Sequence, residues 1–141
     1  MSEAIRWIEN VSKDAVTLGL HSDLGINTML IRIQDPATEF VEPKKEFRET
    51  YQFEFLDSED SDPEHEDAKI SDYQAARLVG LLQRALDKHM NVLVHCHAGI
   101  CRSGAVVEVA TMMGFTATDR HRQPNLRVKH KMMKELGFYY D

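Results

Sequence analysis

Residues 91–95 read Asn-Val-Leu-Val-His, a short, almost wholly apolar run between two stretches of helical character. Before it, Ser71 and Gln74 form a potential capping box that leads into apolar residues at helical spacing. After it, Arg102 opens a second helical stretch, which Gly114 ends. An apolar strand enclosed by two helices predicts crossover connections and therefore a parallel sheet covered by helices.

The rest of the chain extends this order of strands and helices. A short helix is expected at 12–20, strands at 28–33 and 47–56, and a last helix at 124–137, whereas 115–123 is ambiguous. With 141 residues the whole chain, 1–141, is expected to form one domain. The predicted fold class is α/β, a mainly parallel central sheet flanked by helices on both faces, in which ligands bind beyond the carboxyl ends of the strands.

Charge and composition narrow the class of partner. The net charge is −6, from 17 basic and 23 acidic residues, so nucleic acid is an unlikely partner. The longest stretch without Asp, Glu, Lys or Arg, residues 89–101, has 13 residues and is too short to cross a membrane. The N-terminus has no apolar run typical of a secretory signal, and two cysteines are too few for a disulfide framework. We therefore expect a cytoplasmic protein with reduced thiols.

The charge is unevenly spread along the chain. Residues 54–67 carry eight acidic residues and no Lys or Arg, whereas 120–135 carry six Lys or Arg and one acid. An acidic loop and a solvated helix face would explain this distribution. A basic patch beside a site for an anionic substrate would explain it as well.

The segment that follows the apolar strand, His-Cys-His-Ala-Gly-Ile-Cys-Arg-Ser-Gly at 95–104, carries the chemistry. A loop in this position turns backbone N–H groups inward ahead of a helix N-terminus, which makes an anion cradle. Arg102 adds a planar fork for a phosphoryl group, and the N–H dipoles favour the Cys96 thiolate, a nucleophile. In the alternative interpretation, Cys96 and Cys101 are small buried side chains and Arg102 is a surface charge.

This segment resembles the signature H-C-x-x-G-x-x-R-S/T of the cysteine-dependent protein tyrosine phosphatases, particularly the compact dual-specificity-like members of bacteria and phages. The resemblance implies that Cys96 forms a cysteinyl-phosphate intermediate, that Arg102 binds the phosphoryl oxygens and that the Ser103 hydroxyl assists departure of the sulfur. The His95 side chain would hold the loop. No metal or cofactor is implied. The cradle would consist of the N–H groups of His97, Ala98, Gly99, Ile100, Cys101 and Arg102.

Weaker features extend the resemblance over about the last two-thirds of the chain. The order strand, Asp-bearing loop, helix over 53–82 matches the family, and Pro124-Asn125 resembles a Pro-Asn pair whose amide supports the signature loop. Cys101 departs from the compact members, which usually carry Ser there. The low-molecular-weight tyrosine phosphatases do share Cys-x4-Cys-Arg-Ser, but their signature lies near the N-terminus. A regulatory disulfide between Cys96 and Cys101 and a packing role for Cys101 both remain open.

The leaving oxygen of a phosphoester needs a proton donor, which is typically a carboxylic acid. The acidic loop offers Asp57, Asp60 and Asp62. Asp57 directly follows the strand, on the more rigid side of the loop, where family members place their acid. We therefore favour Asp57, followed by Asp60 and Asp62.

Other functions fit the residues less well. Zinc is disfavoured because His95, Cys96 and His97 alternate in direction along a strand, and thiol-linked arsenate reduction needs more than two cysteines. An RNA 5′-phosphatase with the same loop and an inactive phosphate-binding module remain alternatives. The loop has no Lys, unlike the phosphoinositide phosphatases. The expected substrate is a phosphorylated protein that carries phosphotyrosine, with phosphoserine and phosphothreonine as further candidates.

Overall fold

The computed structural model describes residues 5–59 and 63–137. In this part of the chain every helix and strand predicted from the sequence is present, and strands at 7–12 and 116–117 join them. In chain order the elements are β1 (Trp7–Ser12), α1 (Lys13–Leu18), β2 (Thr28–Gln34), β3 (Glu49–Glu54), the 3₁₀ turn η1 (Glu66–Ala68), α2 (Asp72–Asp87), β4 (Asn91–Cys96), α3 (Arg102–Met113), β5 (Thr116–Ala117) and α4 (Leu126–Glu135).

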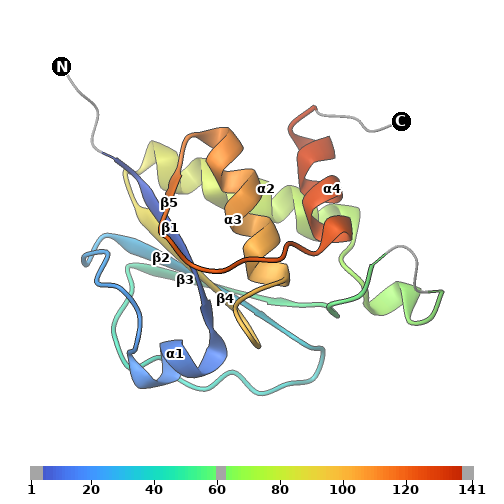
Figure 1. Ribbon diagram of the computed structural model, residues 1–141, viewed down its shortest axis with the longest axis horizontal. Coiled ribbons are helices and arrows are strands. Elements are labelled where there is room, and N and C mark those ends of the chain that lie inside the picture. The colour runs from blue at the N-terminus through green and yellow to red at the C-terminus, as the bar shows by residue number, and fades with distance from the viewer. Residues whose placement is uncertain (1–4, 60–62, 138–141) are drawn as a thin grey trace.

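The described strands form one sheet in the order β3-β2-β4-β1-β5, and every pairing in it is parallel. Helices α2, α3 and α4 lie on one face of the sheet, and α1 lies on the other (Figure 1). The predicted α/β architecture with helices on both faces is thus confirmed. None of the described helices is both long and apolar enough to cross a membrane.

Strand β1 is an element that the sequence patterns did not predict. It pairs with β4 on one side and with β5 on the other, so it lies inside the sheet. Its two central residues, Glu9 and Asn10, are polar, yet each is only 1% exposed. The Glu9 carboxylate accepts hydrogen bonds from the N–H and hydroxyl of Ser22. Because these hydrogen bonds come from a residue outside the strand, a polar strand can lie inside the sheet. The residues of the strand alone do not predict this position.

The helix starts follow the local sequence, with one correction. The Ser12 side chain caps α1, and Ser71 with Gln74 forms the predicted capping box of α2. The last helix was expected to have Pro124 in its first turn, but it begins at Leu126 with Asn125 as its N-cap. The Asn125 carboxamide oxygen accepts the Val128 N–H, and this side-chain cap sets the boundary after the proline.

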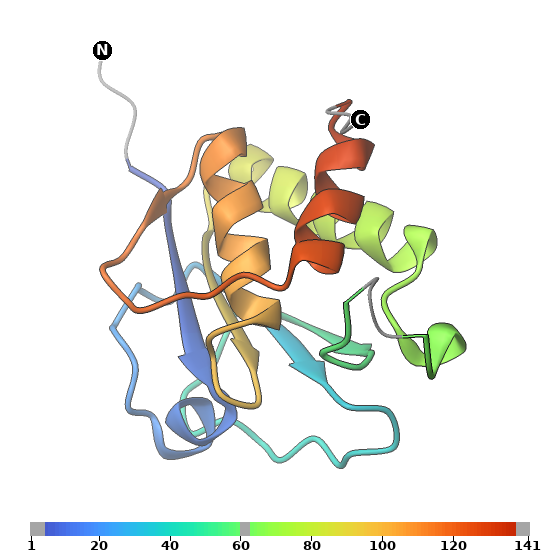
Figure 2. The same cartoon turned by 45° about the vertical axis from the view of Figure 1, so that its right-hand side comes forward.

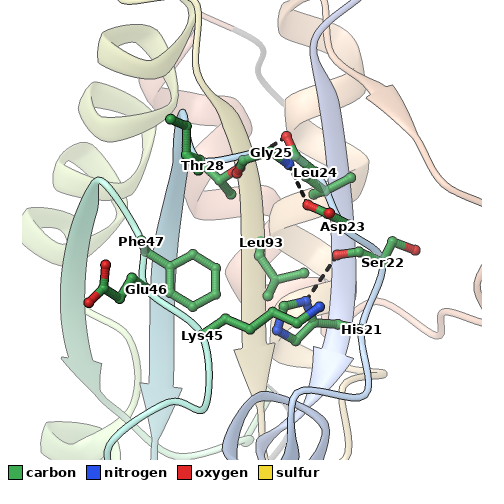
Figure 3. A pocket seen from close by; sticks show the side chains of 11 residues that line it. His21, Ser22, Asp23, Leu24, Gly25, Thr28, Lys45, Glu46, Phe47 and Leu93 are labelled. Atoms are coloured by element: carbon green, nitrogen blue, oxygen red, sulfur yellow. Dashed lines mark hydrogen bonds between the residues drawn. The ribbon is translucent and has the colours of Figure 1, made fainter.

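The sheet separates two apolar clusters of different size. The large cluster fills the space between the sheet and α2, α3 and α4, whereas a small one of Val11, Val16, Leu30 and Leu93 lies under α1. Beside the small cluster lies a cavity of about 340 Å³, whose lining includes Leu93 and Phe47 (Figure 3). None of the site residues named from the sequence lines this cavity.

Candidate active site

Because β1, β2, β3 and β4 are parallel, their carboxyl ends meet at one edge of the sheet (Figure 2). The loop that follows β4, residues 97–101, lies at this edge, and we call it the cysteine loop. Asp35 comes directly after β2, and Asp57 comes three residues after β3 ends. The topology therefore brings two carboxylates and the cysteine loop to one place, as expected for a ligand site in a parallel sheet.

The carbonyl groups of the cysteine loop point away from its centre and bond to the elements around it. Neighbours from β1 to the start of α4 supply the donors. The bonds are Lys13 N–H to His97 O at 3.2 Å, Asn10 Nδ2 to Gly99 O at 2.8 Å, Gln123 N–H to Ile100 O at 3.2 Å and Asn125 N–H to Cys101 O at 3.0 Å. The surrounding elements thus hold the loop in place through hydrogen bonds to its carbonyl oxygens.

The N–H groups of the same loop show the opposite arrangement. Within the described residues, no protein acceptor is hydrogen-bonded to the N–H of any residue from 97 to 101. The loop leads into α3, whose first N–H groups also lack partners within the helix. A set of unpaired N–H groups at a helix N-terminus is an anion-binding site.

Gly99 permits this loop conformation in two ways. Its φ angle is +76°, in the left-handed region that side chains other than glycine rarely adopt. A Cβ atom at this position would overlap the backbone of Val11 and Ser12 at the end of β1. Glycine is therefore required here both for the turn and for the close approach of β1.

The Cys96 thiol lies at the base of the loop, and its residue is only 2% exposed. Its Sγ is 3.2 Å from Oγ of the fully buried Ser103, and either atom could be the donor. When Cys96 is a thiolate, the hydroxyl is the donor. Ser103 then stabilises negative charge on the sulfur, which is what a thiol leaving group needs.

Arg102 is the first residue of α3, and its side chain is anchored at one end only. Its Nη1 donates to Asp35 Oδ1 at 2.7 Å and to the Phe55 carbonyl at 2.9 Å. Its Nε is buried without a partner, and no bond from Nη2 to a described residue is present. The Nε–Nη2 edge, which matches two phosphoryl oxygens, is therefore unoccupied by protein groups.

His95 lies beneath the loop, fully buried, beside Arg32 of β2. Arg32 Nε donates to His95 Nε2 at 3.0 Å, and His95 Nδ1 is 3.4 Å from the Cys96 carbonyl oxygen. Burial, assisted by the positive charge of Arg32, lowers the pKa of His95 to about 4. The imidazole is therefore neutral at physiological pH.

Asp57 is exposed and reaches the other side of the cysteine loop. Its Oδ1 accepts from the Asn125 carboxamide at 2.7 Å. Burial and the neighbouring Asp57 carboxylate raise the pKa of Cys101. Asn125 was expected to support the loop through its amide. The side-chain amide donates to Asp57 instead, whereas the backbone N–H of Asn125 donates to the Cys101 carbonyl of the loop. Asp60 and Asp62 lie outside the described residues.

Sequence reasoning missed three residues at this site. Asp35 was interpreted only as the end of a strand, Arg32 as part of a strand, and Asn10 lies in the strand that was not predicted. The positions just after parallel strands could have revealed Asp35. Arg32 and Asn10 depend on cross-strand neighbours. Cys96 and Cys101 are free thiols, and no cluster of three or more His, Cys, Asp or Glu suited to a metal occurs in 5–59 and 63–137.

Comparison with known proteins finds likeness in structure only. No protein-family model matches the chain, and no curated protein matches it in sequence. A human tyrosine phosphatase-like serine/threonine/tyrosine-interacting protein superposes with a TM-score of 0.54 at 18% identity, over 79% of this chain and 78% of that chain. OH1 from the Orf virus, described as a tyrosine phosphatase with triple substrate specificity, gives a TM-score of 0.51 at 21% identity.

The match to OH1 covers 80% of this chain but only 59% of OH1, so this chain corresponds to about three-fifths of the viral protein. Both matches cover about four-fifths of this chain at low identity, which is evidence about the fold. The chain adopts the fold of the tyrosine-phosphatase-like, dual-specificity-like proteins.

Proposed function

We propose that this protein is a phosphomonoester hydrolase that removes phosphate from phosphorylated proteins through a cysteinyl-phosphate intermediate. The observation that carries the proposal is the polarity of the cysteine loop. The carbonyls of four of its five residues bond outward, and its N–H groups have no acceptor among the described residues, directly above a buried thiol that touches a hydroxyl. A loop built this way favours an anion in the position that a nucleophilic sulfur can attack.

In the first step the Cys96 thiolate attacks the phosphorus atom. The S–P bond forms as the P–O bond to the substrate breaks, and the electron pair of that bond goes to the leaving oxygen. Asp57, in its protonated form, gives this oxygen its proton. The loop N–H groups and the unoccupied Nε–Nη2 edge of Arg102 bind the three equatorial oxygens, on which charge is spread in the transition state.

In the second step a water molecule attacks the cysteinyl phosphate. The Asp57 carboxylate takes the proton of the water, the S–P bond breaks, and the sulfur leaves as a thiolate. The Ser103 hydroxyl, 3.2 Å from Sγ, donates a hydrogen bond to the departing sulfur. Inorganic phosphate is released, and both Cys96 and Asp57 return to their starting protonation states.

The substrate class follows from the rim of the site. His97 and Ala98 at the top of the loop are exposed, and the loop has no Lys to attract a highly charged lipid head group. We propose phosphotyrosine on a protein as the main substrate, with phosphoserine and phosphothreonine accepted as well. The viral structural neighbour, OH1, is itself described as having triple substrate specificity.

The test is hydrolysis of an aryl phosphate in the presence of a chelator, by wild-type protein and by Cys96→Ser. Full activity in chelator and loss of turnover in Cys96→Ser, with phosphate binding retained, are expected. The matched control is Cys101→Ser, which removes the other thiol of the site and should remain active. Substantial activity of Cys96→Ser would refute the covalent mechanism.

A further inference from the structure

Arg32 and His95 are a buried cross-strand pair, directly opposite each other on β2 and β4. They are 2% and 0% exposed. A fixed positive charge is costly to bury, so the side chain of Arg32 must find compensating partners. One of them is His95, whose Nε2 accepts the Arg32 Nε–H at 3.0 Å.

This contact determines where the imidazole proton lies. A guanidinium group only donates hydrogen bonds, so Nε2 of His95 must be the acceptor, and the proton of the neutral ring must be on Nδ1. That Nδ1–H faces the carbonyl oxygen of Cys96 at 3.4 Å. The peptide bond between Cys96 and His97 is trans and planar, so holding its carbonyl on the His95 side directs the His97 N–H to the opposite side.

Arg32 is itself held at its far end. Its Nη2 donates to the Val41 carbonyl, and its guanidinium carbon lies 5.4 Å from the centre of the Phe40 ring. Both residues belong to the segment between β2 and β3, so the guanidinium is clamped between that segment and His95. The charged groups that act on His95 come from three elements: Arg32 on β2, Lys13 on α1 and Arg102 on α3. All are cations, so each disfavours the imidazolium form.

We propose that Arg32 is a positioning residue for the cysteine: it holds the His95 imidazole in its Nδ1–H form, which fixes the Cys96 carbonyl and so the orientation of the first N–H group of the anion cradle. This inference depends on the proposed function for its catalytic meaning. The pairing of Arg32 with His95 and its effect on Cys96 reactivity can be measured without any substrate.

The first measurement is the tautomer of His95, from long-range ¹H–¹⁵N NMR spectra of the imidazole. The wild type should show a neutral ring with the proton on Nδ1 at pH 7. Arg32→Met removes the obligatory donor and should give a mixture of tautomers. Arg32→Lys retains a cation that only donates and should restore the Nδ1–H form. A wild-type ring protonated on Nε2 would overturn the proposal, even if Arg32→Met fails to fold.

The second measurement is the rate at which iodoacetamide alkylates Cys96 at pH 6.5, followed by mass spectrometry of the Cys96 peptide. Arg32→Met removes a buried cation and no longer fixes the orientation of the peptide bond between Cys96 and His97. Alkylation of Cys96 should therefore be about tenfold slower in this variant. Arg32→Lys should recover most of the rate. The matched control is Arg77→Met, whose guanidinium lies over the rings of Tyr51 and Phe53, away from the cysteine loop.

The two proposals fail in different ways. If Arg32→Met alkylates within twofold of the wild type, while Cys96→Ser abolishes hydrolysis, the role of Arg32 is refuted and the phosphatase function stands. If Cys96→Ser still hydrolyses aryl phosphates, but Arg32→Met changes both the tautomer and the alkylation rate, the catalytic mechanism fails and the positioning of Cys96 by Arg32 stands.

Discussion

Arg102 and Asp35 form an ion pair of 2.7 Å in which only Nη1 of the guanidinium is engaged by the carboxylate. The arginine is 4% exposed and comes from the first turn of α3, whereas Asp35 follows β2 and its side chain is 56% exposed. A second bond from Nη1 to the Phe55 carbonyl completes the anchor. The pairing therefore orients the guanidinium and leaves its bidentate edge to a ligand.

Removing this anchor should weaken substrate binding more than turnover. In Asp35→Ala the KM for an aryl phosphate should rise by about tenfold, because a charge-assisted hydrogen bond no longer holds Arg102 in place. Steady-state kinetics on Asp35→Ala and on the control Asp23→Ala, whose carboxylate caps only its own turn at Gly25, would measure this. Tighter phosphate binding by Asp35→Ala would mean that Asp35 competes with the ligand.

Asp57→Asn should lower turnover by about 10²-fold for a phosphate with a poor leaving group, because the leaving oxygen then receives no proton. The loss should shrink for activated leaving groups such as p-nitrophenol. Turnover measured over a series of leaving groups would show this dependence. If Asp60→Asn or Asp62→Asn gives the pattern and Asp57→Asn does not, the acid lies further along the acidic loop.

Cys101 should act through its proximity to the Asp57 carboxylate and should tolerate a hydroxyl in place of its thiol. Cys101→Ser retains a donor of similar size, so kcat should stay within about twofold of wild type. Cys101→Val has nearly the same volume without the donor and should lower kcat by about tenfold for poor leaving groups. Equal kcat values for the Ser and Val variants would show that the Cys101 side chain serves only for packing.

The buried His95 should make the fold sensitive to acid. In the folded chain the pKa of His95 is about 4, against an ordinary value of 6.5, so between these values the unfolded state binds the additional proton. The free energy of unfolding should therefore fall as the pH drops from 6.5 to 4, by up to about 1.4 kcal/mol per pH unit. Carboxylates with a lowered pKa have ordinary values of 4.5 or less, so their contribution begins about one pH unit above these values and is small above pH 5.5.

Urea denaturation between pH 7 and pH 4.5 would measure this dependence. His95→Gln should lack the slope between pH 6.5 and 5.5, whatever its stability at pH 7. His121→Gln, which replaces an exposed histidine, should keep the slope of the wild type. A wild-type slope in His95→Gln would show that another group takes up the proton.

Gly99→Ala should collapse the cradle, because the new Cβ meets the backbone of Val11 and the φ angle of +76° is strained for alanine. Loss of phosphate binding and a lower Tm are expected. Gly80→Ala is the matched control, since no atom lies within 4 Å of a Cβ at this helical position. It should raise the stability by about 1 kcal/mol. Calorimetry with and without inorganic phosphate would compare the two variants.

Local patterns were sufficient to predict most of the elements. The capping box at Ser71, the apolar run at 91–95 and the alternating aromatic residues that include Tyr51 and Phe53 each carry their own signal. Strand β1 carries none, because Glu9 and Asn10 would be read as polar surface. Partners that include Ser22, Arg120, Gly99 and His121 make their burial possible.

The sequence by itself determined the order of the strands and helices other than β1 and β5. It also determined the spacing of Cys96, Gly99, Arg102 and Ser103, because a loop between a strand and a helix depends on contiguous residues. The tertiary structure alone decided which groups orient them. Asp35 on Arg102, Arg32 on His95 and Asn125 on Asp57 are separated by more than 60 residues in each pair. Such pairs meet only because parallel strands bring their carboxyl ends to one edge, and neither hydrophobic periodicity nor motif spacing records which side chains face one another there.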